Sequence, residues 1–413
     1  MKNNVQKVVD SGLCMGCGIC QDSCAKKCIR IHHGKDVNHP VVDTDKCNEC
    51  GLCLKVCAGQ GIELDARSEA LFKDNSTGKD KYLGYYDKCF SGYSTNHDIR
   101  YHSASGGCLS QFLIYLLEKR YVDGVVVVGY EKDKPMMPHT YIAKTKDEIL
   151  AGRSSKYCVT SYEGILSEIK REGGKYVVAG LPCQIQSLRK YTSTFKKAGE
   201  QIVGFFAIYC SSNRTMRSQD FLLYRYGVKR KDIARFAYRD NGCLGEMVFE
   251  DRQGKILKSV PYQTFWIGMR GFFNVPRCST CIDHFGELAN VCFGDIHIGE
   301  YLNDHIGVNS IVSRSSKWTH LLMDAVKEGY LHLDEIPYSV IVDSQGYAMR
   351  QKKGRGVTAT FKLRKMLGRK NPVYDQPFVV TNVGTKDVFK AILKCGMRWM
   401  GKQRWLWPVI CKL

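Results

Sequence analysis

The sequence has no long apolar run. Its apolar runs, such as residues 125–128 and 203–208, fall far short of the roughly 20 apolar residues that a membrane-spanning helix needs. The opening residues, MKNNVQKVVDSG, also lack the apolar segment of a secretory signal peptide. These absences exclude an integral membrane protein and argue against a secreted, disulfide-rich one. We therefore expect the 20 cysteines to lie in the reducing cytoplasm.

Acidic residues are scarce at one end of the chain. Residues 346–413 contain 16 Lys and Arg against two Asp, so they carry +14 of the total formal charge of +20. The preceding 345 residues carry only +6, and the basic character therefore belongs to a C-terminal tail. At 413 residues the chain is long enough for a small module and a separate, larger core domain.

A doubled cysteine frame marks the N-terminal part. The spacing C-x2-C-x2-C-x3-C occurs twice, at Cys14, Cys17, Cys20 and Cys24 and again at Cys47, Cys50, Cys53 and Cys57. Zinc sites rarely repeat three cysteines at this step, whereas bacterial ferredoxins with two 4Fe–4S clusters do. The fourth cysteine of each run usually binds the other cluster. We therefore expect one cluster on Cys14, Cys17, Cys20 and Cys57 and the other on Cys47, Cys50, Cys53 and Cys24.

The chain divides into four regions. Residues 1–66 resemble a (βαβ)2 ferredoxin module, and residues 67–82 contain the polar stretch KDNSTGKDK and are expected to form a linker. Over residues 83–345, expected strands at 124–129, 176–179 and 202–210 alternate with expected helices at 109–119, 162–171 and 185–191. This alternation predicts an α/β core with a mainly parallel or mixed sheet, and an α+β or α/β protein as a whole. Residues 247–250 and 256–260 predict a hairpin, and residues 346–413 form the basic tail.

Two motifs in the core point to bound groups. Ser103, Ser105, Gly106 and Gly107 precede an expected helix, where backbone N–H groups bind anions such as a flavin or nucleotide phosphate. Serine and glycine also cap ordinary helices, so this interpretation stays open. Cys183 follows one expected strand, Cys210 ends another, and Cys278 and Cys281 form a C-x2-C pair. The four are either the ligands of a third 4Fe–4S cluster or separate buried thiols, with a zinc ion between two of them.

The order of the motifs resembles the coenzyme F420 hydrogenase/dehydrogenase β-subunit family. The motifs that carry the resemblance are SASGG at 103–107, GRSSKY at 152–157, GLPCQ at 180–184, Cys210, YRD at 238–240, the pair Cys278 and Cys281, and Gly294-Asp295. The resemblance extends over residues 1–345 and includes a ferredoxin module fused ahead of the core. It implies an iron–sulfur flavoprotein that moves electrons or hydride between clusters, FAD and a second redox partner.

The resemblance also assigns roles to residues. It implies that Cys183, Cys210, Cys278 and Cys281 bind the third cluster, that Ser103, Ser105, Gly106 and Gly107 contact the pyrophosphate of FAD, and that Arg153, Ser154, Ser155, Lys156 and Tyr157 line the flavin pocket. Lys156 would place a cation beside the N1/C2-carbonyl edge of the reduced flavin, and Arg239 would act similarly. Relatives often have tryptophan where this chain has His297. That histidine either donates a proton near the reacting centre or only fills space.

The end of the basic tail interleaves cations with apolar residues. Residues 388–413 contain three tryptophans among lysines and arginines, which fits peripheral contact with an anionic membrane surface. An acidic protein partner is the alternative. No nucleic-acid-binding fold accompanies the charge, so we expect no nucleic acid partner. The expected location is the cytoplasm, at the inner face of the membrane if the tail binds lipid.

These observations predict a flavin-dependent iron–sulfur oxidoreductase. Electrons would pass between two ferredoxin-type 4Fe–4S clusters, the core cluster and FAD, and on to or from an organic hydride acceptor. Its partners would be a redox protein and a small-molecule, glycan or lipid-linked substrate. The alternative is an electron-transfer subunit without a substrate site inside a larger complex, and bound flavin would distinguish the two. A scaffold protein with structural cysteines is a third hypothesis.

Overall fold

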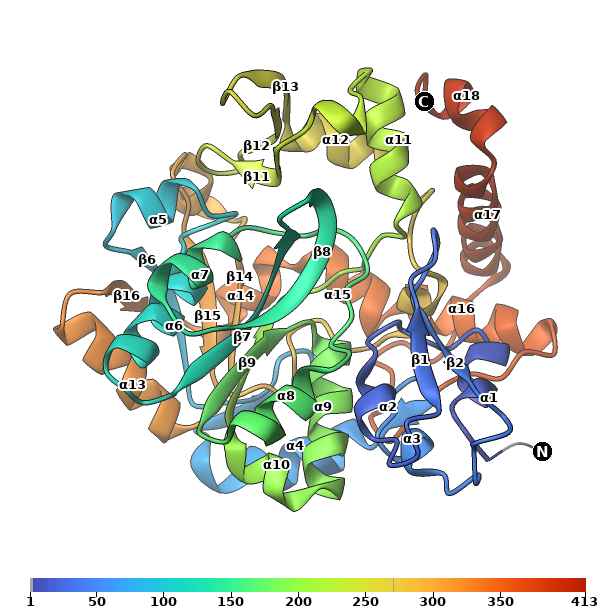
Figure 1. Ribbon diagram of the computed structural model, residues 1–413, viewed down its shortest axis with the longest axis horizontal. Helices are drawn as coiled ribbons and strands as arrows, with labels where there is room; N and C mark the ends of the chain where they lie inside the picture. The colour runs from blue at the N-terminus through green and yellow to red at the C-terminus, as the bar shows by residue number, and fades with distance from the viewer. Residues whose placement is uncertain (1–2, 270) are drawn as a thin grey trace.

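An eight-stranded mixed sheet forms the centre of the computed structural model, which describes residues 3–269 and 271–413 (Figure 1). Its strand order is β16 (Leu331–Glu335), β6 (Lys88–Ser94), β15 (Asn309–Ser313), β14 (Val291–Asp295), β10 (Ile202–Ile208), β9 (Tyr176–Gly180), β7 (Gly124–Glu131) and β8 (Lys134–Ala143). The four neighbours β14, β10, β9 and β7 run parallel, and the other strands pair antiparallel. The predicted α/β core with a mixed sheet is confirmed.

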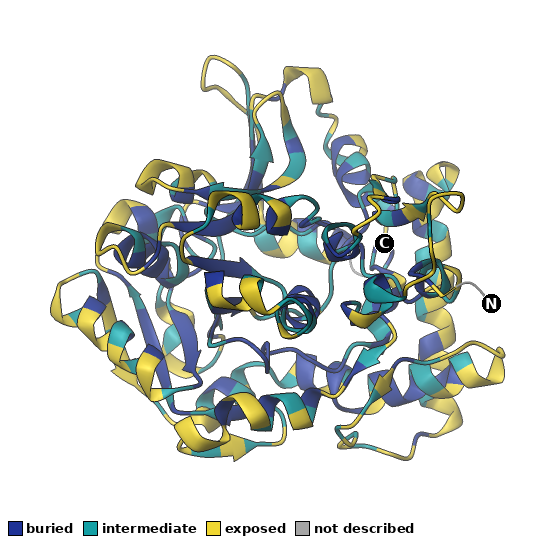
Figure 2. Cartoon of the chain, turned by 60° about the horizontal axis from the view of Figure 1, so that its bottom comes forward, coloured by how far each residue is buried: buried dark blue, intermediate teal, exposed yellow. Residues whose placement is uncertain are grey.

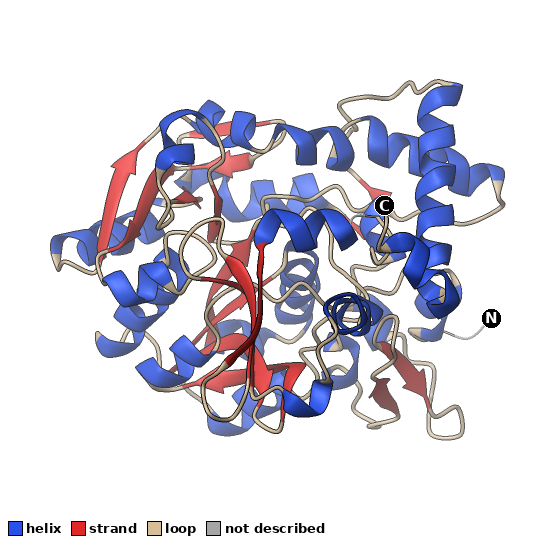
Figure 3. Ribbon diagram, turned by 90° about the horizontal axis from the view of Figure 1, so that it is seen from above, coloured by secondary structure: helices blue, strands red, loops and turns tan. Residues whose placement is uncertain are grey.

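Helices cover both faces of this sheet (Figure 3). Successive strand residues point to opposite faces, and in β9 both sets are apolar. Val177 and Ala179 belong to the hydrophobic cluster of α6 (Cys108–Glu118) and α13 (Ser316–Lys327). Tyr176 and Val178 belong to that of α8 (Ile165–Glu172) and α9 (Pro182–Thr194). Strands that are apolar on both sides are stable only between two helical layers, which fixes a three-layer core.

The N-terminal module packs directly against the core. It contains α1 (Gln6–Asp10), α2 (Ile19–Asp22), β1 (Ile29–His32), β2 (His39–Val42), α3 (Leu52–Lys55) and β3 (Gly61–Ile62). Ile19, Val56 and Ile62 share one hydrophobic cluster with α8 and α9. β1 and β2 pair antiparallel, but β3 pairs in parallel with the distant β17 (Val373–Tyr374), which a self-contained (βαβ)2 module would not require. A Cβ at position 61 would lie 1.8 Å from the Val373 carbonyl oxygen, so only glycine permits this pairing.

The segment that was expected to be a linker, residues 67–82, is folded. Residues 64–86 form α4 (Leu64–Phe72), a 3₁₀ turn at Lys73–Asn75, β4 (Gly78–Asp80) and β5 (Gly84–Tyr86).

A second, smaller sheet lies above the core. It consists of β11 (Arg235–Asp240), β12 (Glu246–Glu250) and β13 (Ile256–Pro261), and it packs with α11 (Arg217–Tyr226) and α12 (Tyr262–Met269). β12 and β13 are the predicted hairpin.

Residues 346–413, predicted as a basic tail, are mostly helical, and their first part enters the protein interior. The helices at this end are α14 (Tyr338–Ser344), α15 (Gly346–Lys352), α16 (Arg355–Met366), α17 (Thr385–Lys402) and α18 (Trp407–Ile410). Lys352 and Lys353 are buried, and Lys353 forms a 2.6 Å ion pair with the buried Glu287. Figure 2 shows the contrast between the buried sheet and the exposed outer helices. No helix among the described residues is long and apolar enough to cross a membrane.

Candidate functional site

The eight cysteines of the doubled frame fall into two groups in space. Cys57 neighbours Cys14, Cys17 and Cys20, whereas Cys47 and Cys50 lie beside Cys53. The Sγ of Cys24 lies 3.3 Å from that of Cys28, and Cys28 also neighbours Cys47. If the fourth cysteine of each run binds the other cluster, Cys57 must lie with the first run and Cys24 with the second, as these two groups do. The role of each cysteine as an iron ligand remains a prediction.

A free thiolate is costly at these positions. Burial raises the pKa of Cys14 to about 12 and that of Cys17 to about 11, and the charge of Cys57 adds to both shifts. Iron offsets this cost because a ligating cysteine binds as a thiolate beside a metal cation. Gly18 and Gly51 start α2 and α3 with φ of 75°, a conformation that glycine adopts without strain. The loops and thiols thus fit iron–sulfur clusters.

One of the two groups faces the core domain. The backbone N–H of Tyr162 donates to the Cys17 carbonyl at 2.8 Å, and Lys190 Nζ donates to the Cys57 carbonyl at 2.9 Å. Cys17 is also a neighbour of Cys183 in the core. Cys50, in the other group, is exposed. The module therefore presents one group to the core and the other toward solvent, an order along which electrons can pass.

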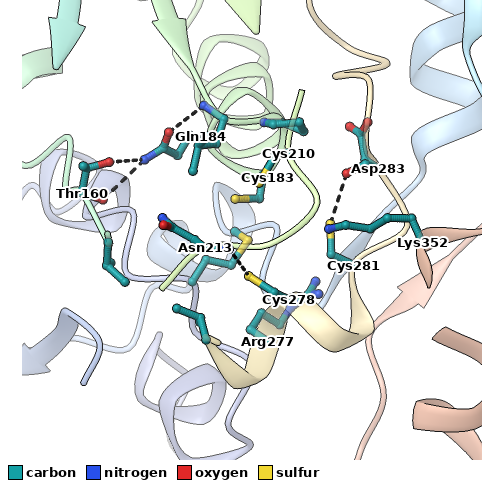
Figure 4. A pocket seen from close by; sticks show the side chains of 15 residues that line it. Thr160, Cys183, Gln184, Cys210, Asn213, Arg277, Cys278, Cys281, Asp283 and Lys352 are labelled. Atoms are coloured by element: carbon teal, nitrogen blue, oxygen red, sulfur yellow. Dashed lines mark hydrogen bonds between the residues drawn. The ribbon is translucent and has the colours of Figure 1, made fainter. Parts of the chain in front are cut away.

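Four core cysteines surround one cavity (Figure 4). Cys183 lies in the first turn of α9 after β9, and Cys210 lies two residues after β10. Cys278 and Cys281 come from the 3₁₀ turn at Pro276–Thr280 and the residue after it. Because β9 and β10 are parallel neighbours, their carboxyl ends meet at one edge of the sheet, which is where α/β proteins bind ligands. The structure thus brings together the four cysteines that the sequence singled out.

Positive charges outnumber negative ones around this cavity. Arg277 and Lys352 line it, with Asp283 as the carboxylate. Arg277 is fixed by donating through Nε to the Gly59 carbonyl at 3.0 Å and through Nη2 to Tyr374 Oη at 3.0 Å. Asp283 accepts hydrogen bonds from Gln186 Nε2 at 3.0 Å and from the Gly286 N–H at 2.7 Å. A buried, net positive cavity lined by thiols suits an anionic iron–sulfur cluster.

A zinc ion between two of these cysteines is the alternative to a cluster. Within residues 3–269 and 271–413, no three His, Cys, Asp or Glu side chains come close enough together to hold one ion. The ligands of a zinc ion converge on one atom, whereas those of a 4Fe–4S cube are spread over four irons. The third cluster on the four core cysteines remains a prediction.

The expected pyrophosphate loop lies at the same edge of the sheet. Gly107 caps α6 with φ of 75°, and the Cys108 N–H donates to Asn309 Oδ1 at 3.0 Å. Asn309 pairs with Asp295 at the end of β14, which brings the start of α6 to that strand end. The hydroxyls of Ser103 and Ser105 donate to the carbonyls of Ile99 and Val308, each at 2.6 Å. Both serines are thus already engaged in holding the loop, and contact of Ser103, Ser105, Gly106 and Gly107 with FAD remains a prediction.

The residues expected around the flavin are linked through a buried ion pair. Arg239 is buried, and its Nη1 lies 2.6 Å from Asp295 Oδ2, which also contacts His297 Nε2 at 3.2 Å. Burial alone would raise the pKa of Asp295, but the charge of Arg239 outweighs it and lowers the pKa. Ser154 Oγ donates to the backbone carbonyl of Arg239. Ser154, Arg239 and His297 therefore form one connected group around Asp295. The sequence pointed to Asp295 only as part of the Gly294-Asp295 motif.

Lys156 folds back onto its own loop. Its Nζ donates to the carbonyls of Gly152 and Arg153, each at 2.6 Å, and burial lowers its pKa to about 7. Arg153 pairs with Asp98 at 3.0 Å. Ser155, the residue before Lys156, is half-buried. Tyr157 packs against Trp266, with ring centroids 4.7 Å apart. An amine with a pKa near 7 changes its charge within the neutral range, which suits a residue that responds to a nearby charge.

Comparison with known proteins identifies the family of the core and of the N-terminal module. Residues 89–167 and 173–338 match the N-terminal and C-terminal parts of the coenzyme F420 hydrogenase/dehydrogenase β subunit, and residues 13–90 match a 4Fe-4S dicluster domain. The coenzyme F420 hydrogenase subunit beta of Methanosarcina barkeri is 27% identical over 229 residues, which are 53% of this chain and 73% of that protein. The coenzyme F420-dependent sulfite reductase of Methanocaldococcus jannaschii is 24% identical over 349 residues, or 80% of this chain and 49% of that protein.

A solved structure shares the fold. A chain of the F420-reducing NiFe hydrogenase complex from Methanosarcina barkeri superposes with a TM-score of 0.56. The superposition covers 73% of this chain and 100% of that one, at 22% sequence identity. At this identity the likeness establishes the fold alone.

Proposed function

This chain belongs to the coenzyme F420 hydrogenase/dehydrogenase β-subunit family, and from that premise we propose that it is a flavin-dependent iron–sulfur oxidoreductase. Family membership and the dicluster domain make it an iron–sulfur electron-transfer protein. The proposal adds a third 4Fe–4S cluster in the core, FAD, and an organic hydride acceptor. The observation that carries it is the convergence of four core cysteines on a cavity beside Cys17 of the ferredoxin module.

The core cysteines connect the module to the rest of the core. Cys183, Cys210, Cys278 and Cys281 would hold a cluster that, when bound, accepts and releases single electrons. Cys183 faces the module through its neighbour Cys17, and Arg277 ties the two parts together by bonding to Gly59. Electrons arriving at the exposed Cys50 side of the module would cross to the core at this contact.

The residues around Asp295 would serve the flavin. FAD, when bound, exchanges electrons singly with clusters and as hydride with an organic partner. The loop before α6 would bind its pyrophosphate, and Lys156 would supply a positive charge when the ring becomes anionic. The ion pair with Asp295 fixes a second cation, the buried guanidinium of Arg239, near this loop. His297, partly exposed on Asp295, would exchange a proton with solvent.

We propose a redox protein as the electron partner and an organic molecule as the hydride partner. Relatives whose names include coenzyme F420 make that deazaflavin one acceptor to assay, beside small-molecule, glycan and lipid-linked substrates. A relay subunit without a substrate site is the second candidate, because a chain of a hydrogenase complex shares the fold. Bound FAD that reacts with an organic hydride acceptor distinguishes the enzyme from the relay.

The test follows electrons from the module to the flavin. The protein is purified anaerobically and reduced with a low-potential ferredoxin, and the bleaching of flavin absorbance is recorded by stopped flow. We expect rapid bleaching in the unmodified protein and bleaching slowed by orders of magnitude in Cys183→Ser, with the module clusters still reduced. Cys89→Ser, which changes a buried thiol of β6 outside the cavity, is the matched control and should not slow it. Absence of flavin, or equal rates in the two variants, would refute the proposal.

A further inference from the structure

The longest helix of the basic tail exposes its apolar side. In α17, Phe389, Ile392, Leu393 and Trp399 follow one another at helical spacing, so they lie on one face. All four are exposed, with Phe389 58% and Trp399 55% accessible. We call this set the outward stripe. Helix α17 lies at the outer edge of the molecule (Figure 1).

The opposite side of the same helix faces the protein. Val388 and Ala391 are buried there, and Met397 and Met400 pack partly buried against the core. Polar contacts accompany them: Arg398 Nη1 donates to Ser279 Oγ at 3.1 Å, and Lys402 Nζ lies 3.1 Å from Asp36 Oδ2. A surface helix ordinarily buries its apolar face and exposes its charges. Because α17 already buries one set of apolar residues, the outward stripe is a second apolar face, which the described residues do not cover.

The helix is held firmly in this orientation. Gly401 packs so closely on Phe272 that a Cβ there would lie 2.2 Å from the Phe272 carbonyl oxygen. Trp407 of α18 is buried, contacts Phe221 and Phe273, and donates through Nε1 to the Gly401 carbonyl at 3.0 Å. Because the packing of Gly401 and of Trp407 fixes the end of α17 on the protein, the outward stripe is a fixed feature of the fold.

The charge around the stripe identifies what covers it. Residues 388–413 contain six Lys and Arg and no Asp or Glu. Lys386 lies three positions before Phe389, and Lys390 lies three positions before Leu393, so both border the stripe. Trp405, 70% exposed, and Arg404 continue the same composition beyond the helix. Apolar side chains and tryptophan bordered by cations are typical of helices that lie on anionic membranes, whereas lysine is depleted in protein interfaces.

We propose that α17 and the segment after it bind the surface of an anionic lipid bilayer, with the outward stripe inserted between the headgroups and Lys386 and Lys390 on the phosphates. The contact is peripheral, since the opposite side of the helix packs on the protein. It would hold the redox core at the membrane. The inference rests on the tail alone and does not depend on the proposed redox reaction.

Vesicle flotation tests this surface with the full-length protein. The probes are vesicles of phosphatidylcholine alone and of phosphatidylcholine mixed with phosphatidylglycerol. We expect binding only to the mixed vesicles, weakened by added salt because the electrostatic part is screened. Phe389→Ser/Trp399→Ser should reduce binding at least tenfold, and Lys386→Glu/Lys390→Glu should abolish the preference for anionic lipid.

The matched control lies on the hairpin of the second sheet. Ile256 of β13 is 54% exposed and stands between the exposed Lys255 and Lys258, so it has a similar local composition without a helix. Ile256→Ser should bind vesicles as the unmodified protein does. Equal binding by all variants, or none by the unmodified protein, would overturn the proposal. So would conversion of a dimer to a monomer by Phe389→Ser/Trp399→Ser, because a second copy would then cover the stripe.

Discussion

Lys352 should set the reduction potential of the proposed core cluster. Its side chain is 3% exposed and lines the cavity of the four core cysteines (Figure 4). Among the described residues it forms no ion pair with a carboxylate, unlike the adjacent Lys353. Burial alone would lower the pKa of Lys352, but the charges of Cys281, Cys210 and Cys278 outweigh it and raise the pKa. We therefore expect this lysine to be positively charged beside the proposed core cluster.

The size of its effect follows from Coulomb's law. Reduction adds one negative charge to the cluster, and a cation about 6 Å away at an effective dielectric constant of about 20 stabilises that charge by ~3 kcal/mol. For a one-electron couple, 59 mV corresponds to a tenfold change in equilibrium, or ~1.4 kcal/mol. Lys352→Met removes the cation and should lower the potential of the core cluster by about 100 mV.

An EPR-monitored redox titration of the anaerobic protein measures this shift. Lys352→Arg keeps the charge and should retain most of the potential, which separates electrostatics from packing. Lys394→Met removes a half-buried lysine of α17 outside the cavity and should leave the potential unchanged. A shift of less than about 20 mV in Lys352→Met would refute the assignment, as would a rise. Equal shifts in the Met and Arg variants would indicate repacking instead of charge.

Three further predictions concern buried charges. Asp295→Asn leaves the buried Arg239 without its partner and should destabilise the fold by about 3–5 kcal/mol in urea denaturation; a loss below about 1 kcal/mol would contradict the pairing. Lys353→Met should cost about as much because it isolates Glu287, and the double variant Lys353→Met/Glu287→Met should recover most of the loss; failure to recover would show that the pair is not the cause. Burial lowers the pKa of Lys156 from 10.5 to about 7, so between these values the unfolded chain binds a proton that the folded chain does not. Stability of the flavin-free protein should therefore rise with pH across this window, and an unchanged slope in Lys156→Met would be inconsistent with that assignment.

The sequence predicted what depends on local pattern and on the geometry of parallel sheets. Cys183 and Cys210 follow neighbouring strands, and the carboxyl ends of such strands meet, so their proximity was predictable. The hairpin of β12 and β13 was predictable from two short apolar runs around a polar turn. The doubled cysteine frame predicted a dicluster module directly.

Contacts between residues far apart in the chain left no pattern in the sequence from which they could be predicted. Lys352 stands in the basic run RQKKGR, where a cation is ordinarily solvated, and only the packing of α15 against the cavity buries it. The pairing of Gly61 with Val373 joins two strands of two residues each, which are too short for a recognisable pattern. The exposure of the outward stripe of α17 was hidden as well, because periodicity groups apolar residues on a helix but does not say which of them are buried.

Quantification of iron, sulfide and flavin per chain after anaerobic purification tests the central claim most directly. Three 4Fe–4S clusters feeding a flavin predict about twelve irons, about twelve sulfides and about one FAD per chain. About eight irons without flavin would contradict the account, and would leave a two-cluster electron carrier whose core has another role.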